Sequence, residues 1–321
     1  MISDAVLPIA SQVSGVLLVM VVGAVARRLG WLSPASDKSL AVLTTNILLP
    51  ALLIDRIVHS AHFNNHTDTW VPPLVGFGCT CVGFGLSWLV IRIIGPWFGI
   101  SDPRVQNTFV LTAGIANFGY IPIPLAEHFF PEALVPLFVH NVGVDLATWS
   151  VGVLVIGGGV GTGWRRAIAS PPLWAVLIAV IIHQLQWTSI LPAPLSQLAK
   201  SLGQCAIPVG LILSGAIIVD YWKDVRWRDG LATLGLACLL RQVIMPVFML
   251  SMAAWMWLPD QMDRVLLLQA SMPAATFPIV LVKLYGGDIP TALRVIVGTS
   301  LLGLVTIPFW MVIGKLWLGI A

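Results

Sequence analysis

Long apolar runs separated by short polar breaks recur along the whole chain. These runs approach the length of one bilayer crossing, and stretches such as 13–26 are continuously apolar instead of alternating with polar positions. The pattern therefore predicts membrane-spanning helices and argues against an outer-membrane barrel. Ten spans are expected, at 5–29, 37–57, 70–95, 105–127, 133–157, 169–187, 196–219, 229–257, 264–283 and 290–318.

Composition supports a polytopic membrane protein and limits what it can do. The 321 residues are 58% hydrophobic and 10% charged, whereas an ordinary soluble domain is about 25% charged. Ten spans leave too little chain for a separate soluble domain, so nucleic-acid partners and extended catalytic modules are not expected. The sequence contains no HExxH or GxSxG motif. We therefore expect neither an enzyme nor a cofactor.

The basic residues predict the orientation of the spans. Most of the 17 Lys and Arg residues fall in the loops that join spans 1 and 2, 3 and 4, 5 and 6, 7 and 8, and 9 and 10. Because Lys and Arg accumulate in cytoplasmic loops, both termini are expected outside. The four Cys residues all lie inside expected spans, where we interpret them as small packing residues.

Ten spans divide the chain into two halves with five spans each. Residues 1–157 and 169–321 would then form two five-helix repeats of opposite orientation, joined by a Gly-rich cytoplasmic linker at 158–168. Inverted repeats of this kind recur in secondary transporters. The expected fold class is thus an all-α polytopic membrane protein in which two inverted five-helix repeats surround a central site.

Two amide residues support the internal repeat. Asn46 in span 2 and Gln204 in span 7 each precede a proline, Pro50 or Pro208, by four residues. Each amide could bond the carbonyl that the proline leaves free, or could contact a ligand in a cavity wall. Both interpretations stay open, and both residues are candidate binding residues.

Spans 4 and 9 are interrupted by paired prolines. Each proline removes a backbone donor and leaves a carbonyl unpaired, so such segments must be buried in protein or line a polar cavity. Paired interruptions are also the best sequence indication of a transporter's substrate site. The candidate binding residues at the interruptions are Asn117, Gly119, Pro122 and Pro124 in span 4, and Pro273, Thr276 and Pro278 in span 9.

Four motifs together resemble the auxin efflux carrier family, whose bacterial members include malonate, malate and other organic-anion permeases. They are the runs at 46–53, 117–125, 270–275 and 285–288, and the resemblance covers essentially the whole chain. It implies an elevator-like carrier in a bacterial inner membrane, with broken helices 4 and 9 crossing at the carboxylate site. Spans 1, 2, 6 and 7 would be the scaffold, which could form a homodimer, and spans 3–5 and 8–10 the mobile transport unit.

Two ionisable residues lie deep inside expected spans. Asp145 is near the centre of span 5, where a charge is costly and is usually functional. It is either the coupling site for a proton or permanently paired with another buried group. Arg241 lies equally deep in span 8 and could bind a substrate carboxylate or neutralise Asp145.

The function predicted from these features is secondary transport of small organic anions, such as malonate or malate, with proton coupling. A sodium-coupled carrier is an alternative, because unwound carbonyls could hold a cation. A receptor that binds a ligand without moving it is another. His59, His62 and His66 have a spacing that metal ligands can use and leave a metal permease as a third alternative, but they lie in an Asn-rich loop and no metal site is predicted.

Overall fold

The computed structural model describes residues 2–59, 66–157, 171–187, 192–222, 230–256 and 258–320. These residues form helices and their connections, with one isolated antiparallel β-bridge between Ala116 and Ala274. The prediction of a helical membrane protein is confirmed. Within the described ranges, seven helices are long and apolar enough to cross a membrane: Leu7–Arg28, Pro34–Val58, Trp70–Ile93, Pro131–Val155, Ala193–Asp220, Leu231–Trp255 and Ile289–Leu318.

The three other expected spans are shorter or divided. Span 4 consists of α5 (Pro103–Gly114) and α6 (Pro122–Phe129), and span 9 of α14 (Asp260–Ser271) and α15 (Pro278–Leu284). A proline begins the second helix of each pair, where its missing N–H costs least. Span 6 contains the 14-residue helix α10 (Pro171–Gln184). The ten-span count and the two inverted repeats therefore stay predictions, and the expected linker at 158–168 lies outside the described residues.

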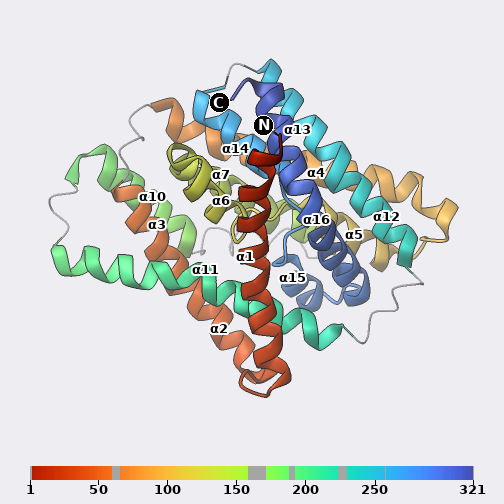
Figure 1. The fold of residues 1–321 in the computed structure, drawn as a ribbon. Helices are drawn as coiled ribbons and strands as arrows, with labels where there is room; N and C mark the ends of the chain where they lie inside the picture. The colour runs from red at the N-terminus through yellow and green to blue at the C-terminus, as the bar shows by residue number, and fades with distance from the viewer. Residues whose placement is uncertain are drawn as a thin grey trace.

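A first group of helices comprises α1, α2, α3, α10 and α11. In Figure 1, α1 (Ile2–Arg28) crosses α11 (Ala193–Tyr221) at a steep angle. The crossing is close, since a Cβ at Gly23 would collide with the Ile212 carbonyl and one at Gly215 with the Met20 carbonyl. Helices α2 (Asp37–Leu43) and α3 (Leu49–Val58) both pack on α11, and α3 also packs on α10.

A second group surrounds the interrupted helices. Helix α4 (His66–Ile93) packs on α7 (Leu134–Ala147) and α5, while α16 (Ile289–Leu318) packs on α5, α12 (Leu231–Leu239) and α14. Helix α13 (Met245–Trp255) packs on α14, and the short α8 (Val153–Val155) comes after α7 and one intervening turn. Both chain termini lie at the same end of the molecule (Figure 1).

Three π-helical turns widen helices within the described ranges. Two of them, η2 (Thr44–Leu48) and η8 (Leu240–Ile244), end two residues before the prolines Pro50 and Pro246. A proline cannot donate to the carbonyl four residues earlier, and at Pro246 that carbonyl, of Gln242, accepts a 2.7 Å hydrogen bond from the Trp310 indole. The third, η5 (Thr148–Gly152), follows α7. Such turns are frequent at functional sites.

Candidate functional site

The two interruptions meet at the centre of the second group. The amide of Asn117 donates to the Pro273 carbonyl at 2.8 Å, and the amide of Ala275 donates to the Ile115 carbonyl at 3.0 Å. These bonds flank the bridge between Ala116 and Ala274. The unwound segments thereby satisfy part of each other's backbone, as the interior of a membrane protein requires.

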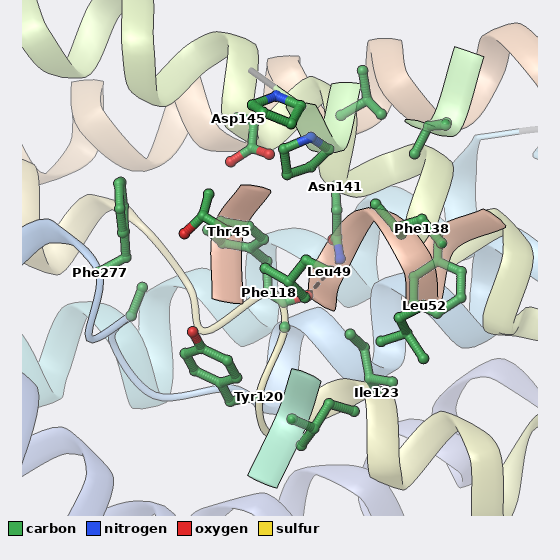
Figure 2. Close-up of a pocket in the computed structure, with 18 of the residues that line it drawn as sticks. Thr45, Leu49, Leu52, Phe118, Tyr120, Ile123, Phe138, Asn141, Asp145 and Phe277 are labelled. Atoms are coloured by element: carbon green, nitrogen blue, oxygen red, sulfur yellow. Dashed lines mark hydrogen bonds between the residues drawn. The ribbon is translucent and has the colours of Figure 1, made fainter. Parts of the chain in front are cut away.

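Side chains hold this crossing in place. The Asn117 carboxamide oxygen accepts from the Ile121 amide at 3.4 Å, and the Thr299 hydroxyl oxygen accepts from the Ala274 amide at 3.1 Å. Asn141 donates to the Phe118 carbonyl at 2.6 Å, the dashed line in Figure 2. Residues on α7 and α16 thus fix the unwound segments from two sides.

A cavity of about 630 Å³ lies beside the crossing. Its walls come from both helix groups, with Leu49 and Leu52 of α3 facing Phe118, Phe138 and the crossing segments (Figure 2). Most of the lining is apolar, and no Lys or Arg is among the described residues that line it. The polar or partly polar side chains on the wall are Thr45, Asn46, Asn117, Tyr120, Asn141, Asp145, Trp149 and Thr276.

Asp145 is the carboxylate on this wall. It lies near the C-terminal end of α7, one helical turn after Asn141, so the two side chains share a face. In Figure 2 its carboxylate faces the same space as the Thr45 and Tyr120 side chains. The Asp145 side chain is partly exposed to the cavity and has no hydrogen bond or ion pair with another described residue. It is free to interact with a ligand.

The structure brings together five of the residues expected at the site. Asn46, Asn117, Gly119, Thr276 and Asp145 all line the large cavity. The prolines act through the backbone: the Pro273 carbonyl accepts the bond from Asn117, while Pro122 and Pro278 begin the half-helices. Expected residues that do not line the cavity are Pro122, Pro124, Gln204, Arg241, Pro273 and Pro278.

Gln204 and Arg241 lie elsewhere for different reasons. Gln204 is an exposed residue of α11, although Ile207 one turn later reaches the cavity. Arg241 is fully buried behind the crossing, where its Nη2 donates to the Met272 carbonyl at 3.2 Å. It lines a second, small cavity, and within the described residues it forms no ion pair with Asp145.

Several lining residues were not expected from the sequence. Asn141 could have been found, because it stands one helical turn before Asp145 on the same face. Tyr120 lies inside the interrupted segment of span 4, and Thr45 is next to Asn46. The aromatic wall residues Phe118, Phe277 and Trp149 carry no local signal, because aromatic residues are common throughout a membrane protein.

The outer histidines form no metal site within the described residues. His59 Nδ1 is 2.8 Å from the Asp55 carbonyl oxygen and its Nε2 is 3.1 Å from the Ser196 hydroxyl. His62 lies outside the described residues, and the side chain of His66 does as well. No group of three His, Cys, Asp or Glu residues in the described ranges could hold a metal ion.

Comparisons with known proteins agree with this architecture. The sequence profile of the family described as membrane transport protein matches residues 8–157 and 160–311. An uncharacterized transporter of Methanothermobacter thermautotrophicus is 26% identical over 94% of this chain and 97% of its own length. An uncharacterized transporter of Methanocaldococcus jannaschii is 23% identical over 92% of this chain and 95% of its own length. The resemblance to the auxin efflux carrier family is thereby confirmed at the level of a membrane transport family.

Proposed function

The chain belongs to the membrane transport protein family, and from this premise we propose that it is a proton-coupled secondary carrier of organic anions with one carboxylate and an apolar body. One observation carries the proposal: where the structure describes its lining, the cavity at the crossing has mainly apolar walls and one carboxylate, Asp145, and no basic residue. Its volume of about 630 Å³ lies in the range of pockets that enclose small organic molecules.

The lining favours a monocarboxylate over the malonate or malate expected from the sequence. A small dicarboxylate would bring two charges into a site whose described lining has no Lys or Arg, and a buried charge is costly unless it is paired. An aryl or alkyl acetate brings one charge and an apolar body that the Phe118, Phe138 and Phe277 side chains can contact. Asn117 and Thr276, beside the interruptions, are the proposed polar contacts for its carboxylate.

Asp145 supplies a reason for proton coupling. An ionised Asp145 repels a substrate carboxylate in the same cavity, whereas a protonated Asp145 can donate a hydrogen bond to it. Substrate and proton would therefore bind together and leave together. Arg241, which lines the other cavity, takes no part in this proposal.

The position of the cavity supports alternating access. The cavity lies between the two helix groups, and we propose that the first group is the scaffold and the second the transport unit. An ion pair of 2.7 Å joins Arg56 of α3 to Glu127 of α6 at the end that the distribution of basic residues places outside. Val42 and Pro171 line the cavity toward the opposite, cytoplasmic end. We interpret this conformation as inward-facing, with an elevator-like movement of the second group opening the other side.

Two alternatives predict different measurements. In a sodium-coupled carrier, a sodium gradient drives uptake and a proton gradient does not; in a receptor, the ligand binds but no flux occurs. The test uses labelled phenylacetate and malonate, with binding measured in detergent and flux measured in proteoliposomes. The proposal predicts saturable binding and flux of phenylacetate, weaker malonate flux, and loss of both in Asn117→Ala. Binding without flux, or malonate as the preferred solute, would contradict it.

A further inference from the structure

A second cavity lies behind the crossing, separated from the large one. Its volume is about 10 Å³, which is room for a single water molecule or a monatomic ion. The wall includes Thr80 and Cys79 of α4, His140 of α7, Arg241 of η8 and Gln269 of α14. The elements that carry these residues all belong to the second helix group, so the cavity is internal to that group.

Three nitrogen atoms on residues of this wall have no hydrogen-bond partner in the part of the chain that the structure describes. They are His140 Nε2, Arg241 Nε and Gln269 Nε2, and each of the three residues is 1% exposed. Buried polar atoms in proteins nearly always have a partner. Three unpartnered nitrogens on residues that share one cavity therefore indicate a bound species; Arg241 Nε and Gln269 Nε2 can only donate to it, whereas His140 Nε2 donates or accepts with its protonation state.

The charge of the wall selects an anion over a cation. Arg241 is a buried guanidinium, and no carboxylate is among the described residues that line this cavity; Asp145 lines the large one. A buried charge without a counter-charge is strongly unfavourable. A small anion at this position would accept hydrogen bonds from Arg241 Nε and Gln269 Nε2 and would also compensate the guanidinium.

The protonation state of His140 follows from its neighbour. Asn141 uses its amide nitrogen to donate to the Phe118 carbonyl, so its amide oxygen is the atom that lies 3.3 Å from His140 Nδ1. The proton is therefore on Nδ1, and Nε2 of the neutral ring is an acceptor. Only the doubly protonated ring can donate from Nε2 to an anion.

We propose that this cavity binds one chloride-sized anion together with one proton on His140, and holds a water molecule when His140 is neutral. The other titratable groups facing His140 are Cys79 of α4 and Arg241 of η8; α13 and α14 contribute Met245, Met249 and Gln269. On α7 itself, Asp145 comes five residues later and faces the large cavity. The site is separate from the proposed substrate site and does not depend on it.

The first test is thermal unfolding of the purified protein in detergent. Chloride is titrated against gluconate, which is too large for the cavity, at constant ionic strength and at several pH values. Chloride should raise the Tm of the wild type, and the half-saturating chloride concentration should rise about tenfold per pH unit where His140 is neutral, because one proton is taken up with each anion.

Three variants separate the parts of the proposal. His140→Gln places a non-titrating amide donor at this position, so it should keep the chloride effect and lose its pH dependence. Gln269→Leu removes one donor and should weaken the chloride effect at least tenfold. Gln197→Leu, an exposed amide of α11, is the matched control and should behave as the wild type does.

The second test is crystallographic and needs no variant. Crystals grown at low pH with bromide should show anomalous scattering within hydrogen-bond distance of Arg241 Nε and Gln269 Nε2. A Tm that depends on ionic strength alone, or a cavity without bromide, would overturn the anion site. A chloride effect with the same pH dependence in the wild type and in His140→Gln would overturn the role of His140.

Discussion

The amide N–H of Asn117 donates a 2.8 Å hydrogen bond to the carbonyl oxygen of Pro273, and so joins the interruption in the first half of the chain to that in the second. The bond satisfies two backbone groups that the broken helices would otherwise leave unpaired. The backbone of the crossing is therefore fixed by its own pairing and by Asn141 and Thr299. Side chains on the cavity wall can vary without unpairing this backbone.

Asn141→Leu should destabilise the crossing. The substitution removes the donor to the Phe118 carbonyl and the acceptor beside His140, and an unmade buried hydrogen bond costs about 1–3 kcal/mol. We expect a lower Tm in thermal unfolding and weaker substrate binding. Asn107→Leu is the control, since the Asn107 carboxamide meets only an exposed Arg92 at 3.4 Å. Equal Tm values for the two variants would show that Asn141 does not support the crossing.

Gly23→Ala should destabilise the first helix group. A Cβ at Gly23 would collide with the backbone of Ile212 where α1 crosses α11, and overpacking of this kind costs about 1–3 kcal/mol. Gly15→Ala is a matched control on the same helix, because a Cβ there meets no atom within 4 Å. Unfolding in detergent should show a lower Tm for Gly23→Ala alone. A Tm unchanged by Gly23→Ala would argue against the close crossing.

A disulfide across the outer ion pair should stop transport. Arg56→Cys with Glu127→Cys, in a background without the four native cysteines, would link α3 to α6 where the ion pair now joins them. If the two helix groups slide during transport, oxidation should abolish flux in proteoliposomes and reduction should restore it. Each single Cys variant serves as a control. Flux that continues through the oxidised double variant would exclude a movement of α6 relative to α3.

A new basic residue in the cavity should change its selectivity. Thr45→Arg would place a guanidinium on a wall that has no cation among its described lining residues, and guanidinium pairs well with carboxylates. Competition assays should show at least a tenfold shift in the ratio of malonate to phenylacetate binding toward malonate. Thr45→Gln, a polar but neutral variant, should leave the ratio near that of the wild type. An unchanged ratio in Thr45→Arg would indicate that the substrate carboxylate binds elsewhere.

The sequence predicts the helical class and the positions of the interruptions because both depend on local chemistry. Long apolar runs indicate segments that span a bilayer, and closely spaced prolines indicate where a helix lacks backbone N–H donors. The partner of each unwound segment is a long-range contact that no local pattern contains. The bond from Asn117 to Pro273 is therefore visible only in the structure.

Depth in a span does not reveal which way a side chain faces. Asp145 and Arg241 are about equally deep by sequence, yet one lines the large cavity and the other lines the small one. Arg241 lies within a π-helical turn, which alters the helical register after it. Asn46 and Gln204 share the same spacing to a proline, but only Asn46 lines the large cavity. A shared local motif thus did not predict a shared contact.

The central claim is that Asp145 couples substrate movement to a proton. The direct measurement is uptake of labelled phenylacetate into proteoliposomes with and without an imposed proton gradient, compared between the wild type, Asp145→Asn and Asp102→Asn. Asp102 caps α5 at the exposed end of the helix, where Asn also caps well. We predict gradient-driven accumulation in the wild type and Asp102→Asn, and gradient-independent equilibration in Asp145→Asn. Gradient-driven accumulation by Asp145→Asn at the wild-type level would contradict the claim.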